Sequence, residues 1–202
     1  MTTEEQILQT AEKLFLEKGF AMTSTTEIAK EVGCNQALVH YYYRTKENLF
    51  LQVFMQKVRL FITAFTEKSE ANDDFFERLE KRICAHANMM EQNPNLPFLI
   101  MNELILNKKR RCMIRDYIVD NPMVRDIYYE FDKEIKDEIA KGVIKPIDTL
   151  DLLLNVLSLN VFIFVSAPIY TDILGRTDKE KQAYIAHRKK LVVQIILNSL
   201  KS

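Results

Sequence analysis

A histidine, three adjacent tyrosines and three basic residues lie within 25–50, which reads TTEIAKEVGCNQALVHYYYRTKENLF. Cationic and hydroxyl side chains can bind phosphates, and side-chain amides can hydrogen-bond to the edges of bases. The same residue types could also form a core or a catalytic cluster. Which of these they form depends on the elements that carry them.

The spacing of apolar residues predicts short helices on both sides of this segment. The first helix begins at Thr2 or Thr3, either of which could form a capping box, and it stops at Gly19. The second begins near Ser24 and ends at Gly33.

The residues Ala29, Gly33 and Val39 have the spacing of a helix-turn-helix. The small Ala29 allows the two helices to approach, and Gly33 accepts the positive φ of the turn. The branched Val39 on the second helix packs against the first helix. Asn35 can cap the third helix, and a fourth helix starts near Thr45. In such a pair the second helix enters the DNA major groove.

The polar residues around this turn then gain a role as DNA contacts. Asn35 and Gln36 stand at the base-reading end of the third helix, and Lys46 lies near the positive end of the fourth. The predicted DNA-contacting residues are Thr25, Thr26, Asn35, Gln36, Ala37, His40, Tyr41, Tyr42 and Lys46.

Two observations favour other interpretations. Residues 1–50 carry five Lys/Arg against seven Asp/Glu, an unusual balance for a DNA-binding module. Tyr43, four residues after Val39, is expected in the core. A helical protein-interaction module without DNA binding therefore remains the alternative function.

Residues 7–50 resemble the DNA-binding domain of the tetracycline-repressor (TetR) family of transcription regulators. The similarity rests on the motifs A..LF...G and TT.IA, the glycine turn, and a tyrosine and an aromatic before RTKENL. The sequence departs from the pattern at Cys34, Ala37 and His40, and the last of these stands where an aromatic that touches phosphate is usual. By the resemblance, Thr26, Asn35, Gln36, Ala37, Tyr41, Tyr42 and Lys46 face DNA.

The whole chain is predicted to be all-α, because four Gly and five Pro in 202 residues leave little punctuation for short strands. Residues 1–48 are the predicted helix-turn-helix domain and 49–202 a helical domain. The resemblance implies that this second domain binds a ligand and dimerises, which makes the protein a repressor released by a small, mostly apolar molecule. Apolar helices at 149–166 and 180–200 are the predicted homodimer interface.

Apolar and aromatic residues on the intervening helices are candidates for the ligand pocket, although most such residues are ordinary core. The predicted set is Phe61, Phe65, Met89, Phe98, Met101, Tyr128, Phe131 and Phe162. Candidate buried polar partners are Asn102, Glu103, Asn155 and Asn160.

Several classes of protein are not expected. The three histidines are scattered without metal-ligand spacing, and no phosphate loop or nucleophile motif occurs, so we expect neither an enzyme nor a metal or other cofactor. Three cysteines without a CxxC indicate reduced thiols. The N-terminus is too polar for a secretory signal, and the run at 150–170 is too short and too polar for a membrane span, which predicts a cytoplasmic protein.

Overall fold

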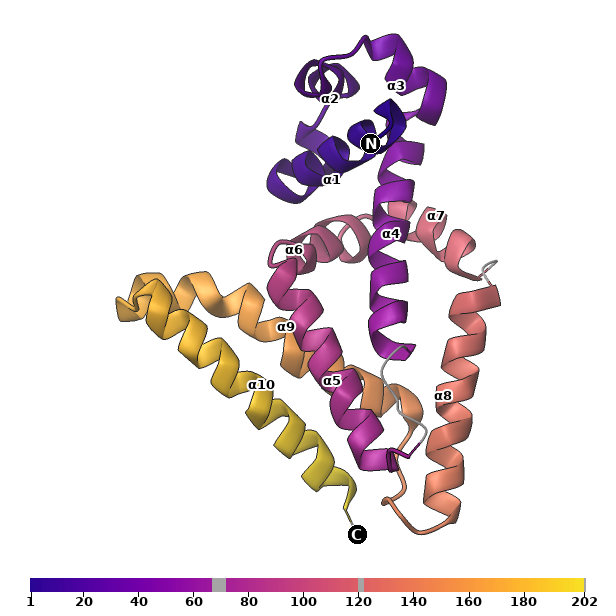
Figure 1. Cartoon of the computed structure of the whole chain (residues 1–202), viewed down its shortest axis with the longest axis vertical. Helices are drawn as coiled ribbons and strands as arrows, with labels where there is room; N and C mark the ends of the chain where they lie inside the picture. The colour runs from indigo at the N-terminus through magenta and orange to yellow at the C-terminus, as the bar shows by residue number, and fades with distance from the viewer. Residues whose placement is uncertain (67–71, 120–121, 202) are drawn as a thin grey trace. The chain divides into compact units, whose positions relative to one another are not determined.

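The computed structural model describes residues 1–66, 72–119 and 122–201, and every regular element in these ranges is a helix (Figure 1). The predicted all-α class is therefore confirmed. The chain forms two compact units, Met1–Leu60 with Phe98–Tyr117, and Phe61–Pro97 with Ile118–Ser202. The boundary at residue 48 stays a prediction about domains.

The first unit begins with the helices of the predicted helix-turn-helix. Its elements are α1 (Thr3–Met22), α2 (Thr25–Val32), α3 (Gln36–Tyr43), most of α4 (Lys46–Thr66), most of α6 (Leu96–Ile100), the π-helical turn η1 (Met101–Ile105) and most of α7 (Lys108–Val119). Phe15, Phe20 and Phe50 pack their rings at centroid distances of 5.2–5.8 Å. Ile7 and Ile28 are completely buried.

Local capping explains where α1 begins. Thr2 accepts from the backbone N–H of Glu5, and the Glu5 carboxylate accepts from the Thr2 N–H, so the first of the two predicted capping boxes is present. Gly19 has φ 78° and interrupts the helical backbone, after which the chain continues helically to Met22. The predicted stop is thus a break within α1.

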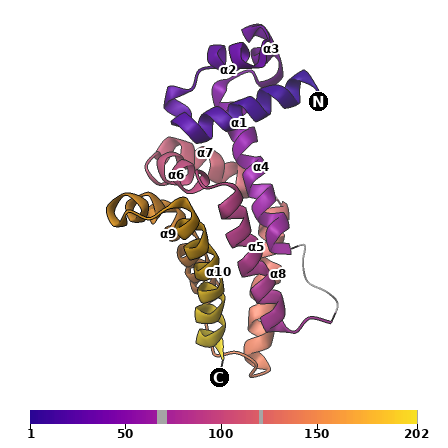
Figure 2. The same cartoon turned by 60° about the vertical axis from the view of Figure 1, so that its left-hand side comes forward.

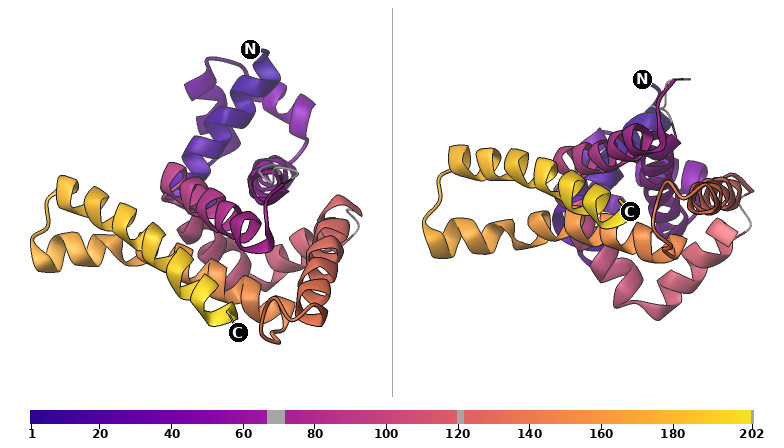
Figure 3. Two further views of the ribbon diagram at one scale, coloured as in Figure 1. Left: turned by 60° about the horizontal axis from the view of Figure 1, so that its bottom comes forward. Right: turned by 90° about the horizontal axis from the view of Figure 1, so that it is seen from below.

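The second unit contains α5 (Phe75–Gln92), α8 (Pro122–Ala140), α9 (Thr149–Leu174) and α10 (Asp178–Leu200). Helices α9 and α10 form an antiparallel pair, and α5 packs against both (Figures 2 and 3). The buried core of this unit comprises Phe75, Leu79, Ile83, Phe131, Ile135, Ile144, Leu152, Val156, Val192, Val193, Ile196 and Leu200.

Helix α9 is longer than the sequence predicts, because it continues through Pro168 to Leu174 instead of ending before the proline. Proline cannot donate to a helical hydrogen bond, which usually ends or bends the helix. On either side of the proline, the hydroxyls of Ser166 and Thr171 donate to the carbonyls four residues earlier, those of Phe162 and Ala167.

Helices α9 and α10 carry many exposed apolar residues. Those on the two helices are Leu150, Leu154, Phe162, Ile169, Ile173, Leu174, Tyr184 and Ile195. By length and composition Thr149–Ala167 could cross a membrane, and 39% of its most apolar stretch is buried in the structure. Core helices of soluble proteins pass the same test, so the predicted absence of a membrane span stays a prediction.

Candidate DNA interface

Helices α2 and α3 are joined by the tight turn that the sequence predicts. Ser24 caps α2 by accepting from the Glu27 N–H at 3.1 Å. Gly33 has φ 78° and ψ 28°, a left-handed conformation that glycine adopts without steric cost. Ala29 and Val39 are 2% and 1% exposed, so the small and branched residues pack inside the unit as expected.

The N-terminus of α3 is organised by its cap. Asn35 Oδ1 accepts from the Ala37 N–H at 2.9 Å, and Gln36 is the first residue of the helix. In helix-turn-helix proteins this end of the second helix contacts base edges. The cap therefore fixes the backbone from which Gln36 extends.

Three predicted contact residues are already linked to one another. Gln36 Nε2 donates to Thr25 Oγ1 at 3.1 Å and lies 3.3 Å from His40 Nε2. His40 Nδ1 lies 3.1 Å from the carbonyl oxygen of Arg44, which can only accept, so this nitrogen carries the proton in the neutral imidazole. His40 Nε2 then accepts from Gln36, so the side-chain amide nitrogen of Gln36 donates both of these hydrogen bonds.

The end of α3 is strained. Arg44 has φ 61° and ψ −50°, a left-handed backbone that favours glycine. Just before it, Tyr43 is 7% exposed and donates its hydroxyl to the Glu4 carbonyl at 3.1 Å, as expected of a core tyrosine. Burial raises the pKa of Tyr43 to about 12, so this hydroxyl keeps its proton.

The remaining predicted contact residues lie on the surface of the first unit. Tyr41 is 78% exposed, and its ring packs edge-on against that of Tyr42 at 5.2 Å. Thr26 and Ala37 are exposed, and Lys46 is half-buried at the start of α4. The structure thus gathers all nine residues on α2, α3, their connection and the start of α4, while their contact with DNA remains a prediction.

Sequence reasoning missed a cluster behind Lys46. Its ammonium lies 4.2 Å from the centroid of the Phe20 ring, and the Arg110 guanidinium lies 3.7 Å from that same centroid. Burial is the main cause that lowers the pKa of Lys46, and the charge of Arg110 adds to it. The predicted phosphate contact is therefore part of a cation–aromatic cluster.

Glu103 completes this cluster. Its side chain is buried, pairs with Arg110, and accepts from the backbone N–H of Phe20 at 3.2 Å. That N–H directly follows the break at Gly19. In the sequence, the only sign of this cluster is a single carboxylate within the apolar run LIMNELIL. From the sequence alone, that carboxylate is assigned to the ligand pocket instead.

The other candidate polar partners differ in burial. Asn160 is 2% exposed and its amide donates to the Ile83 carbonyl and to His86 Nδ1, both at 3.1 Å. Asn102 and Asn155 are exposed. Of the four candidates, two are therefore buried in the structure.

The predicted ligand residues do not share one environment. Met89 and Phe131 are buried in the second unit, whereas Tyr128 and Phe162 of that unit are 41% and 63% exposed. Phe98 and Met101 belong to the first unit and are 38% and 42% exposed. The side chains of Phe61 and Phe65 lie outside the described part of the structure. The ligand set remains a prediction.

A helix-turn-helix with this geometry defines a class of DNA-binding regulators, and comparisons with known proteins show which family it resembles. Residues 7–53 match the model described as bacterial regulatory proteins, tetR family. The fatty acid metabolism regulator protein of Bacillus subtilis is 25% identical over 140 residues, which cover 69% of this chain and 70% of that protein. The probable HTH-type transcriptional regulator YttP of Bacillus subtilis is 41% identical over 134 residues. That match covers 63% of this chain and just over half, 56%, of YttP.

The fold of the whole chain has counterparts among solved structures. A bacterial regulatory protein in the tetR family from Rhodococcus RHA1 aligns over 97% of both chains with a TM-score of 0.71 and 20% identity. Residues 7–53 therefore form a DNA-binding domain of the TetR type, and the chain is a DNA-binding transcriptional regulator. Members of this family are regulators rather than enzymes.

Proposed function

We propose that this protein is a dimeric repressor that binds an operator through α3 and is released by a small, mostly apolar ligand. One observation supports the DNA-binding part of the proposal. Gln36, the first residue of α3, is held by contacts with Thr25 and His40 beside the exposed face of that helix. Since its target is DNA, we place the protein in the cytoplasm. Operator binding, dimerisation and ligand binding occur in TetR-family regulators generally.

Base reading and phosphate binding should be separable in this surface. Gln36→Ala should relax base preference at one operator position by about 1–3 kcal/mol, because an amide can pair with adenine through two hydrogen bonds. Lys46→Ala should weaken binding to all sequences alike and reduce the salt slope by about one charge. Gel shifts with the protein's own upstream DNA and single-base variants measure both. Equal losses at every base for both variants would contradict this division.

Dimerisation is the second part of the proposal. A reader of two half-sites needs its two recognition helices about 34–36 Å apart, which a symmetric dimer provides. The exposed apolar residues of α9 and α10 support an interface on these helices, because large exposed apolar patches mark interaction sites.

Leu154→Glu should shift the protein toward monomer, raise the dimer dissociation constant at least tenfold and weaken operator binding. Leu154 is 52% exposed in the isolated chain, so a carboxylate there is tolerated by the monomer and is costly only when a partner covers it. Light scattering over a concentration series measures the shift.

The matched control is Leu106→Glu, since Leu106 is also exposed, at 74%, but lies outside the proposed interface. It should leave the dimer intact. Ile196 is a poor test of the interface, because it is 2% exposed and belongs to the core of its own chain. A monomeric wild-type protein at micromolar concentration would refute the dimer.

Ligand release is the third part of the proposal. The second unit is larger than dimerisation needs, and it carries buried polar groups such as Asn160 among apolar residues. A ligand can weaken operator binding only if it binds the conformation that does not bind DNA more tightly than the one that does. This difference in binding free energy is typically about 1–3 kcal/mol. Operator DNA must then weaken ligand binding by the same factor, and titrations in both directions test this.

A further inference from the structure

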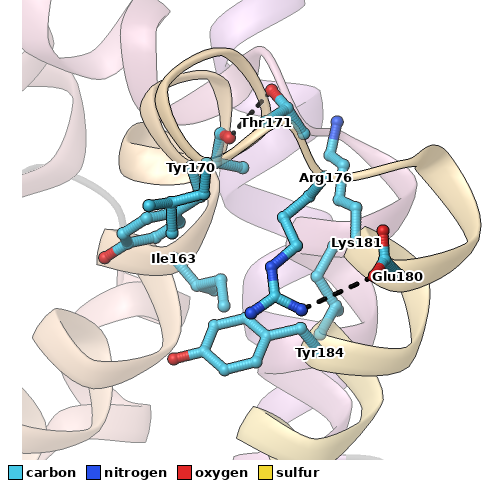
Figure 4. A pocket seen from close by; sticks show the side chains of 10 residues that line it. Ile163, Tyr170, Thr171, Arg176, Glu180, Lys181 and Tyr184 are labelled. Atoms are coloured by element: carbon cyan, nitrogen blue, oxygen red, sulfur yellow. Dashed lines mark hydrogen bonds and ion pairs between the residues drawn. The ribbon is translucent and has the colours of Figure 1, made fainter.

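A cavity of about 180 Å³ lies between the end of α9 and the start of α10, entirely within the second unit (Figure 4). Ile163, Ala167 and Ile185 form its apolar lining and are buried. The rings of Tyr170 and Tyr184 also line it and meet edge-on at 6.2 Å. The cavity therefore offers apolar and aromatic contacts to a bound molecule.

The polar lining of this cavity carries an excess of positive charge. Arg176 and Lys181 stand against a single carboxylate, Glu180. Glu180 Oε2 is already engaged, because it accepts from the Thr177 backbone N–H at 2.8 Å and from the Thr177 hydroxyl at 2.9 Å. These bonds are the main cause that lowers the pKa of Glu180, so the carboxylate stays ionised as the cap of α10.

The two cations are correspondingly weakly neutralised. Arg176 Nη1 lies 3.7 Å from Glu180 Oε1, longer than the roughly 2.7–2.9 Å of a charge-assisted hydrogen bond. Within the described ranges of the chain, Lys181 forms no ion pair. Figure 4 shows the Arg176 side chain extended across the cavity toward Tyr184. A guanidinium and an ammonium therefore adjoin an apolar cavity with free bonding capacity.

We propose that this cavity binds a small amphipathic anion, whose carboxylate lies at Arg176 and Lys181 and whose apolar body lies against Ile163, Ala167 and Ile185. The guanidinium can bind a carboxylate through two parallel hydrogen bonds, which is better geometry than its present contact with Glu180 provides. The volume is below the roughly 300–1,000 Å³ of pockets for drug-sized ligands, so the anion is small. This site is separate from the predicted ligand set, because none of those eight residues lines it.

The test is calorimetric titration of the full-length protein with octanoate. Octanol and octylamine keep the chain but lack the negative charge, and acetate keeps the carboxylate but lacks the chain. Octanoate should bind at least tenfold more tightly than each of the three. Failure of octanoate to bind, or equal binding of octanol, would overturn the proposal.

Variants locate the binding. Arg176→Gln should weaken octanoate affinity about tenfold to a hundredfold, in keeping with the usual strength of hydrogen bonds to charged groups. Lys181→Gln should weaken it less, because a lysine binds a carboxylate through a single point of contact. The matched control is Lys179→Gln, an exposed lysine that does not line the cavity, and it should have no effect.

A cavity-filling variant provides an independent readout. Ala167→Leu should block octanoate binding while the circular dichroism of the helices stays unchanged. If Ala167→Leu fails to fold, the charge variants Arg176→Gln and Lys181→Gln still test the proposal. Unchanged octanoate affinity in Arg176→Gln would assign the binding to another site and overturn the proposal. A shift in the monomer–dimer equilibrium of Arg176→Gln without any octanoate binding would assign the cavity to a partner copy, which also overturns it.

Discussion

Glu103→Ala should destabilise the first unit by about 3–5 kcal/mol, the largest single-residue effect that we expect in this protein. The substitution leaves the guanidinium of Arg110, whose side chain is only 15% exposed, without its carboxylate. It also removes the acceptor of the Phe20 N–H. Removing one member of a buried pair costs more than the pair itself contributes, because the remaining charge stays away from water.

Urea unfolding followed by circular dichroism at fixed protein concentration measures this effect. Glu103→Gln should cost less, because the amide oxygen can still accept from the Phe20 N–H. Glu31→Ala is the matched control, since Glu31 pairs with Lys13 at 2.6 Å on the surface, where ion pairs contribute little. A Glu103→Ala protein as stable as Glu31→Ala would show that the cluster does not hold the unit together.

The same cluster bears on DNA binding. Arg110 and Lys46 both contact the ring of Phe20, so loss of Glu103 changes the charge balance next to a predicted phosphate contact. The π-helical turn Met101–Ile105 carries Glu103 into this position, and such turns occur frequently at functional sites. Helix α1 thus depends on a carboxylate 83 residues away for the hydrogen bond that follows its break.

The helix-turn-helix could be predicted from the sequence because its determinants are local. Ser24 and Asn35 cap helices within three residues of themselves, and Gly33 supplies its own backbone conformation. Each of these signals acts over one turn of helix, where residue type and geometry are tightly linked. The spacing of Ala29 and Val39 then fixes how the two helices pack.

The more distant features could not be predicted in the same way. A lone Glu103 in an apolar run shows that a buried carboxylate needs a partner, but not that the partners are Arg110 and the Phe20 N–H. Similarly, the sequence predicts that the apolar residues of α10 all belong to the dimer interface. In the structure Ile196 packs within its own chain while Ile195 is 42% exposed, a division that depends on the rotation of the helix against α5 and α9.

The stability of the second unit should fall by about 2 kcal/mol between pH 7.5 and pH 5 because of His86, and by about 3 kcal/mol as the pH approaches 4. His86 on α5 is 3% exposed, and its Nδ1 faces the amide Nδ2 of Asn160 on α9. The amide nitrogen can only donate, so Nδ1 accepts and carries no proton in the folded state. Protonation would place two donors against each other in a buried site.

Burial lowers the pKa of His86 from 6.5 to about 4. Below pH 6.5 the unfolded chain binds a proton that the folded chain does not, so falling pH stabilises the unfolded state relative to the folded state in this window. The contribution is fully present above pH 6.5 and is lost progressively toward pH 4. Carboxylates titrate in the lower part of the same range, so the wild-type curve alone does not isolate the histidine.

His86→Gln isolates the contribution, because the glutamine oxygen can still accept from Asn160 but the side chain does not titrate. Its stability should fall by about 2 kcal/mol less than that of the wild type between pH 7.5 and pH 5, as measured by urea unfolding at each pH. His187→Gln is the matched control, since His187 is exposed, and it should keep the wild-type dependence. If His86→Gln and the wild type lose the same stability over this range, His86 is protonated in the folded state and the hydrogen bond from Asn160 to Nδ1 is not its resting arrangement.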